Sequence, residues 1–225
     1  NLETGEVANI TNLDWDLAFN VTNFSSAIKI NGSIGTEVYL YPYSSNYWNS
    51  VDTSIVSWNS IHNEESVISW NIGNVNIGTS IYIIKLSDGS FKKIQFYQLS
   101  NDTYYFKYAN VDGTNEVSAS ISKSDYEGKN FGYYSLQTNQ EIDREPMSNN
   151  WHLLFTKYRT GFNISGTEYL FTAAGVLTNY GLEVAQIENV ANNDVYACSF
   201  SDLYSSHINT IGWDWKSFSW TTGSY

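Results

Sequence analysis

Hydrophobic and polar residues alternate with a period of two along most of this chain, which is the pattern of half-buried β-strands. The run Ser80–Phe96, SIYIIKLSDGSFKKIQF, predicts a hairpin with the Asp-Gly pair at 88–89 in a type I′ turn at its tip. Thr103–Tyr108, TYYFKY, predicts a further strand, whereas Val117–Ser124, VSASISKS, fits either a strand or one helical turn. Long helical periodicity is absent, so we expect an all-β fold with little helix.

Composition supports a globular β protein. Of the 225 residues, 42% are hydrophobic and only 15% are charged, so the chain can bury a sizeable core. Aromatic residues reach 16%, and aromatic side chains favour strands. The single cysteine, Cys198, excludes an intrachain disulfide, and its place in the run VYACSF predicts a small buried side chain.

One phrase occurs twice in the chain: Trp15–Phe19 reads WDLAF and Trp151–Phe155 reads WHLLF. Other matches follow in the same order, namely Leu2 and Thr4 with Leu136 and Thr138, and Gly35–Leu40 (GTEVYL) with Gly166–Phe171 (GTEYLF). Ordered matches of this kind indicate an internal repeat. We therefore predict two related β units, residues 1–134 and 135–225, whose aromatic strands pack into one core of a single compact domain.

The end of the second repeat differs from the first. ISW at Ile68–Trp70 aligns loosely with IGWDW at Ile211–Trp215, and in the first repeat the Ser80–Phe96 hairpin follows this tryptophan. Too few residues follow Trp215 for another hairpin of that length. We expect the second unit to lack its final hairpin.

Charge excludes several classes of protein. Asp and Glu number 23 against 11 Lys and Arg, a formal net charge of −12. Nucleic-acid binding needs a basic surface, so we exclude it. An anionic lipid surface would also repel the chain, and we expect no transmembrane segment because no apolar run is long enough. The chain contains no GxSxG, HExxH, paired-cysteine or glycine-rich phosphate-loop motif, so we expect no enzyme.

Several phrases resemble the HmuY family of haem-binding lipoproteins from the surface of Bacteroidetes. They are NLETGEV, WDLAF, IYIIKLSDGSFKKIQF, YSLQTNQE, WHLLFTKY, AAGVLTNYGLEVA and IGWDWKSF, and they cover nearly the whole chain. The resemblance implies an all-β protein exported to the outer membrane and anchored by a lipidated cysteine that would precede Asn1. It also implies that the protein binds haem between loops and passes it to a TonB-dependent transporter.

The resemblance further implies two axial side chains on the haem iron, a histidine pair in some members and a methionine pair in others. Met147, in the polar stretch REPMSNNW, is the single methionine, so a methionine pair within one chain is excluded. A family ligand falls near this position and its partner beyond FTKY, where the stretch FTAAGVLTN holds no His, Met, Cys or Tyr. This departure puts the usual ligand pair in doubt.

Histidines offer other axial ligands. His62 and His207 each lie eight residues before a repeat-related tryptophan, Trp70 and Trp215, so they could face one another as a ligand pair. They also fit two surface loops, and a mixed pair of Met147 with a histidine is a further alternative. His152 lies next to Trp151, and alternation directs it away from that ring towards solvent or a polar partner.

The stretch YLYPYSSNYW gathers flat amphipathic side chains, Tyr41, Tyr43, Tyr47 and Trp48. Such rings suit a porphyrin face, a sugar face or a protein partner. Tyrosine can also serve as a phenolate ligand of haem iron, but the 18 tyrosines leave that choice open. The sequence therefore predicts a haem-binding surface protein. The alternative is a surface lipoprotein of the same fold that has lost haem ligation and binds a glycan, a peptide or an outer-membrane protein.

Overall fold

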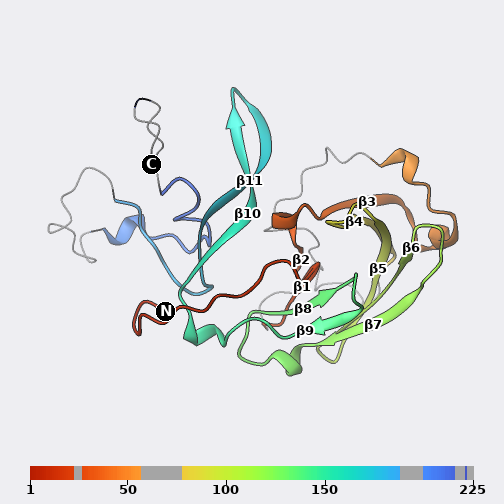
Figure 1. The fold of residues 1–225 in the computed structure, drawn as a ribbon, viewed down its shortest axis with the longest axis horizontal. Helices are drawn as coiled ribbons and strands as arrows, with labels where there is room; N and C mark the ends of the chain where they lie inside the picture. Colours follow the sequence, from red (N-terminus) through yellow and green to blue (C-terminus); the bar gives the residue numbers. More distant parts are fainter. Residues whose placement is uncertain (23–26, 57–77, 188–199, 216–220, 222–225) are drawn as a thin grey trace. The chain divides into compact units, whose positions relative to one another are not determined.

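The computed structural model describes residues 1–22, 27–56, 78–187, 200–215 and 221. Strands dominate, and the helical elements described are 3-10 turns of three to six residues, so the all-β prediction is confirmed. The chain divides into two compact units (Figure 1). Unit 1 comprises Asn1–Asn9, Pro146–Tyr158 and Thr172–Tyr225, and unit 2 comprises Ile10–Glu145 and Arg159–Phe171.

The larger sheet belongs to unit 2 and has the strand order β3-β4-β5-β6-β7 (Figure 1). Its antiparallel strands are β3 (Glu37–Ser44), β4 (Ser80–Lys85), β5 (Phe91–Ser100), β6 (Thr103–Asn110) and β7 (Val117–Ser122). The predicted hairpin is therefore confirmed, and the ambiguous stretch at 117–124 is a strand that runs into a 3-10 turn. The short turns of this unit are η1 (Gly32–Ile34), η2 (Ser45–Ser50), η3 (Thr53–Ile55) and η4 (Lys123–Tyr126).

The turn between β4 and β5 differs from the predicted type. A type I′ turn needs positive φ at two consecutive residues, and here Gly89 has a φ of +84° whereas Asp88 is not in the left-handed region. Gly89 N donates to Leu86 O at 2.9 Å, and Leu86 N donates to Ser90 O at 2.8 Å. This is a three-residue loop closed by a left-handed glycine. The prediction was right about the position of the turn and wrong about its type.

A second sheet of unit 2 has the order β2-β1-β8-β9. Its strands are β1 (Leu17–Asn20), β2 (Ile28–Ile30), β8 (Phe131–Ser135) and β9 (Gln140–Ile142). The antiparallel register of β1 and β8 sets Gly132 opposite Phe19. The predicted boundary between residues 134 and 135 therefore falls inside β8. This strand pairs with β1, which contains part of the first tryptophan phrase.

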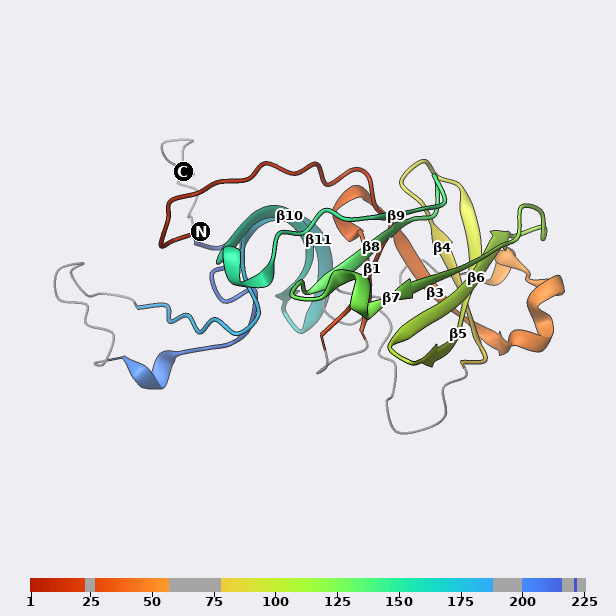
Figure 2. The same cartoon turned by 90° about the horizontal axis from the view of Figure 1, so that it is seen from below.

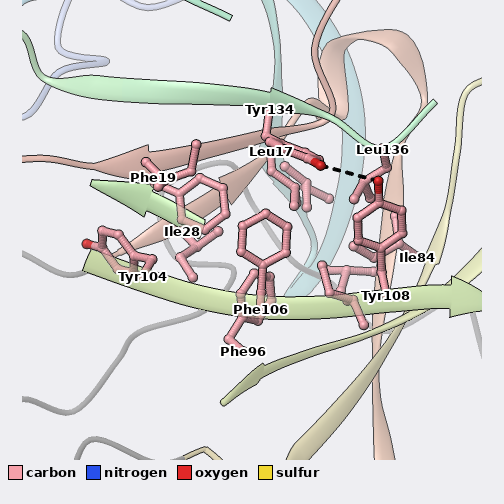
Figure 3. Close-up of a cluster of buried hydrophobic side chains, with 14 of the residues drawn as sticks. Leu17, Phe19, Ile28, Ile84, Phe96, Tyr104, Phe106, Tyr108, Tyr134 and Leu136 are labelled. Carbon is pink, nitrogen blue, oxygen red and sulfur yellow. Dashed lines mark hydrogen bonds between the residues drawn. The ribbon is translucent and has the colours of Figure 1, made fainter. Parts of the chain in front are cut away.

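The main hydrophobic core lies between these two sheets of unit 2 (Figure 3). Phe106 is central, with ring centroids 5.1 Å from both Phe19 and Tyr134. The members of this buried cluster all fall between Leu17 and Leu136. We predicted a core shared by both repeats, but among the described residues the buried clusters contain no side chain of the second tryptophan phrase. The physical reason is that this phrase folds into unit 1.

Unit 1 is built around a long hairpin (Figure 2). Its strands are β10 (Leu153–Ile164) and β11 (Thr167–Thr178), and its short turns are η5 (Ser148–Asn150) and η8 (Ser201–Leu203). The outer part of the hairpin, Arg159–Phe171, is grouped with unit 2, and there Arg159 Nη2 lies 3.4 Å from Glu37 Oε1. Within the described ranges, β10 and β11 form a two-stranded sheet of their own.

Matching hydrogen bonds show how the two repeats correspond. Asn31 Nδ2 donates to the carbonyl oxygens of Asn12 and Trp15, at 2.8 and 3.0 Å. Asn179 Nδ2 donates in the same way to Ser148 and Trp151, at 2.5 and 2.8 Å. The hairpin of β1 and β2 therefore corresponds to the hairpin of β10 and β11, and each ends at an asparagine that ties down the segment before its tryptophan.

This correspondence corrects one part of the sequence alignment. Gly166 lies at the tip of the β10–β11 hairpin with a φ of +86°, whereas Gly35 lies beyond β2, after Asn31. Gly35 and Gly166 are therefore not equivalent. The second hairpin is longer than the first and places a GTE triplet at its tip.

The two segments that begin at Leu2 and at Leu136, here called the leucine phrases, are exchanged between the units. Leu136 N donates to Asp16 Oδ2 at 2.8 Å in unit 2, and Leu2 N donates to His152 Nδ1 at 3.0 Å in unit 1. Each tryptophan phrase is thus paired with the leucine phrase of the other repeat. This exchange explains why unit 1 contains the first nine residues together with Pro146–Tyr158 and Thr172–Tyr225.

Candidate functional site

Two loops of unit 1 are fixed to the end of β11. Asn179 Nδ2 holds Ser148 and Trp151 as described above, and Asn179 N donates to His152 O at 2.9 Å. The neighbouring Thr178 N donates to Ile208 O at 2.7 Å. Ser148 follows Met147 and Ile208 follows His207 in the chain, so the loops carrying these two predicted ligands are anchored on consecutive residues.

The loop around His207 is held by further hydrogen bonds. Val184 and Ser205 exchange backbone hydrogen bonds at 2.9 and 2.8 Å. His207 N donates to Ser205 Oγ at 3.2 Å, and Thr210 N donates to His207 O at 3.1 Å. The backbone at His207 is therefore well defined while its imidazole is exposed, as a side chain that binds a ligand requires.

Met147 also presents its side chain to solvent. It is 41% exposed, which is unusual for a thioether, and its carbonyl accepts a hydrogen bond from Asn150 N at 2.8 Å. Four residues later in the chain, Trp151 Nε1 is buried without an acceptor among the described residues. In the first repeat the equivalent Trp15 Nε1 donates to Asn12 Oδ1 at 2.7 Å. The second repeat thus holds an unused donor next to the loop of Met147.

His152 has a polar partner, as expected from alternation. Its Nδ1 accepts the hydrogen bond from Leu2 N, so in the neutral ring the proton lies on Nε2. A ring in this state has no lone pair left for a metal unless the bond to Leu2 breaks. His152 therefore orders the first residues of the chain and is a poor axial ligand.

Large apolar side chains are exposed in the same segments. Tyr180, directly after Asn179, is 43% exposed, and Leu203 and Tyr204, directly before Ser205, are 52% and 39% exposed. Exposed apolar side chains of this size, in the same segments as accessible ligand side chains, suit a flat apolar molecule.

The aromatic stretch of β3 and η2 serves mainly to build unit 2. Tyr41 and Trp48 are buried, with Tyr41 Oη accepting from Asp52 N at 2.8 Å and Trp48 Nε1 donating to Glu116 Oε2 at 2.7 Å. These two rings are therefore not accessible to a ligand. The half-exposed Tyr43 packs edge-to-face on Tyr41 and remains accessible, and the Tyr47 side chain lies outside the described residues.

Two lysines of unit 2 contact Trp48. Lys93 Nζ donates to Trp48 O at 2.7 Å and lies 5.0 Å from the ring centroid, and Lys107 Nζ lies 4.4 Å from it. Burial lowers the pKa of Lys93, and the charge of Glu116 opposes that shift. Cation–π contacts and the carbonyl acceptor together hold the buried ammonium group. The arrangement is structural.

Some predicted sites lie outside the described residues. They include His62, the ISW phrase at 68–70 and Cys198, so the His62–His207 pair stays a prediction. The described ranges contain no group of three or more His, Cys, Asp or Glu side chains able to hold a metal ion.

Sequence reasoning missed two buried acids of unit 2. Asp16 accepts hydrogen bonds from Leu136 N and the Gln137 side chain, and burial raises its pKa against the opposing effect of those bonds. Glu145 accepts from Asn130 Nδ2 at 2.9 Å and from Phe131 N at 2.8 Å, and burial raises its pKa to about 7. Both acids fix the ends of β8, so their role is structural. Sequence reasoning also missed Asn179, although its position after the second strand matches that of Asn31.

A groove of about 340 Å³ lies on the β10–β11 hairpin within unit 1. Its lining residues are Phe155, Thr156, Lys157, Ala174, Gly175 and Trp215. Phe155 is 71% exposed and Trp215 is 55% exposed. This groove is the second surface of unit 1 on which aromatic side chains are presented.

Comparisons with protein-family models, with curated proteins and with solved structures find no match to this chain. None of the helices in the described part of the chain has the length and hydropathy needed to cross a lipid bilayer.

Proposed function

We propose that this chain binds haem at the end of β11, with Met147 and His207 as the axial ligands. The observation that carries the proposal is the anchoring of both ligand loops on Thr178 and Asn179. It supports the mixed pair that the sequence left open. In line with the resemblance to the HmuY family, we propose a lipid-anchored protein of the outer-membrane surface that delivers haem to a TonB-dependent transporter.

The residues present fit the chemistry of haem. Iron in a haem takes thioether and imidazole axial ligands, and its ring needs apolar contacts. Met147 and His207 are exposed donors of these two kinds, and the exposed Tyr180 and Tyr204 supply ring contacts. Haem would contribute its iron chemistry, and the chain would hold and orient it.

A haem titration of the purified protein tests this proposal. We expect a Soret shift that saturates at one equivalent and the reduced bands of a low-spin, six-coordinate iron. Met147→Ala and His207→Ala should each give a five-coordinate, high-spin spectrum and weaken haem binding by about tenfold or more, since each removes one bond to iron. His62→Ala should leave the spectrum unchanged.

Asn179→Ala tests the anchoring itself. It removes both bonds that hold the Met147 loop, so we expect weaker haem binding with both axial ligands still in the chain. Asn31→Ala is the matched control, because it removes the same two contacts in unit 2 and should leave haem affinity unchanged.

Absorbance that never saturates would overturn the haem proposal and favour the glycan, peptide or protein-binding alternative. A spectral change in His62→Ala with none in Met147→Ala would instead overturn the axial pair.

A further inference from the structure

The chain contains a single Asn-Gly pair, Asn31–Gly32, and it lies directly after β2. Asn31 is 1% exposed, and Gly32 is also buried, at the start of η1. Every polar atom of the Asn31 side chain is hydrogen-bonded. Its Nδ2 donates to Asn12 O and Trp15 O, as described above, and its Oδ1 accepts from Ser33 Oγ at 2.6 Å. An asparagine that is followed by glycine is thus enclosed in unit 2.

An Asn-Gly pair is the dipeptide in which asparagine loses its side-chain amide most readily. Glycine has no Cβ, so its backbone nitrogen can approach the side chain of the residue before it. In this reaction Gly32 N attacks Asn31 Cγ, the bond from Cγ to Nδ2 breaks, and the proton of Gly32 N leaves with that nitrogen as ammonia. Water then opens the resulting succinimide ring at one of its two carbonyls, which leaves aspartate or isoaspartate at position 31.

The folded state shields the pair from this reaction. The attacking nitrogen must lose a proton to solvent, and burial of Gly32 keeps solvent away from it. Attack would also turn the flat amide of Asn31 into a tetrahedral centre, which disrupts the three hydrogen bonds that hold it. The reaction therefore requires that unit 2 opens.

Neither product fits the folded unit 2. Both products carry a carboxylate, which when ionised accepts hydrogen bonds and donates none. At position 31 this carboxylate would face the carbonyl oxygens of Asn12 and Trp15, and a buried charge without a partner is costly. Isoaspartate in addition inserts a methylene group into the backbone between β2 and η1.

The second repeat has the same asparagine without the glycine. Asn179 Nδ2 holds two carbonyl oxygens in the same way, but the residue after it is Tyr180. A side chain at this next position slows the attack, because its Cβ crowds the backbone nitrogen. We therefore expect Asn179 to keep its amide under conditions in which Asn31 loses its own.

We propose that Asn31 is a deamidation site that the fold of unit 2 shields, and that its reaction in the opened chain prevents unit 2 from refolding. Each long opening of unit 2 thus converts part of the protein irreversibly. The site belongs to unit 2 and does not depend on haem binding.

Site-specific mass analysis of the intact chain tests the first step. The protein is kept at mildly alkaline pH with and without urea and is then digested in acid, and asparagine, aspartate and isoaspartate at position 31 are separated. In urea we expect conversion of Asn31 but not of Asn179. Without urea, conversion should be slower by about tenfold or more, because it follows the population of the open form. Gly32→Ala should keep the Asn31 amide in urea, and this control does not require the variant to fold.

Dilution out of urea tests the second step. We expect chains that refold to contain asparagine at position 31, and chains that fail to refold to contain aspartate or isoaspartate. Asn31→Asp starts from one of the two products, so its β1 amides should exchange hydrogen faster by about tenfold or more.

Equal conversion of Asn31 with and without urea would overturn the shielding by the fold. Faster conversion of another asparagine in urea, or undiminished conversion in Gly32→Ala, would overturn the assignment of the site. The same mixture at position 31 in refolded and unrefolded chains would overturn the effect on refolding.

Discussion

Single residues differ between the repeats in ways that the local sequence conceals. Asp16 and His152 occupy the same position of the repeated phrase, and each accepts a backbone N–H from a leucine. Asp16 is buried and its pKa is raised, whereas His152 is only partly buried and has kept an ordinary hydrogen-bonding role. The environment of the side chain at this repeated position therefore depends on how deeply each unit buries it.

Glu145 makes the stability of unit 2 depend on pH. Its pKa in the folded protein is about 7, above the ordinary value of 4.5, so the folded state binds a proton more tightly than the unfolded chain does. The stabilising effect of protonation is full below pH 4.5 and is lost as pH rises through 7. The difference corresponds to about 3 kcal/mol in the free energy of unfolding.

We expect Glu145→Gln to flatten this pH dependence between pH 5 and pH 8, measured by urea unfolding at several pH values. The amide keeps an oxygen to accept from Asn130 or Phe131 but carries no charge to desolvate. Asp16→Asn is a useful comparison, because the raised pKa of Asp16 acts in the same direction. A slope unchanged in Glu145→Gln would contradict the assignment of the effect to that residue.

The equivalent strands β1 and β10 have different neighbours. β1 lies between β2 and β8 and is covered by the core, whereas β10 has β11 alone among the described strands. Among the described strands, the same sequence phrase therefore builds a central strand in unit 2 and a strand with one neighbour in unit 1. The repeated phrase determines the local strand conformation. The neighbours of each strand determine how much its side chains contribute to stability.

Phe19→Ala and Phe155→Ala should separate these roles. We expect Phe19→Ala to lower the free energy of unfolding by about 3–5 kcal/mol, because it opens a cavity beside Phe106 and Tyr104. Phe155→Ala should change it by less than about 0.5 kcal/mol. Chemical denaturation measures both, and similar losses in the two variants would show that Phe155 is also a core residue.

The whole chain consists of two units with unequal cores. The main buried cluster belongs to unit 2, and within the described residues unit 1 is held largely by backbone hydrogen bonds and by Asn179. Regions with fewer buried apolar contacts open at lower free energy.

Native-state hydrogen exchange should resolve the two units. We expect the amides of β5 and β6 to exchange most slowly, at the free energy of global unfolding, and those of β10 and β11 near Phe155 to exchange faster by local opening. Equal protection in all four strands would mean that both units unfold as one.

Sequence alone determined the all-β class, the β4–β5 and β6 strands and the existence of a repeat, because alternation and turn residues act over a few neighbouring positions. It also marked Met147 and His207 as exposed loop residues. It could not determine the turn type at Gly89, since the type depends on the φ of Asp88.

Tertiary structure alone decided which segments of the repeats pair. The exchange of the leucine phrases, the equivalence of Asn31 with Asn179 and the burial of Tyr41 and Trp48 all rest on contacts between residues far apart in the chain. Such contacts leave no periodic trace in the sequence. For the same physical reason, WDLAF and WHLLF look alike as phrases, while Phe19 lies in a core and Phe155 lies on a surface.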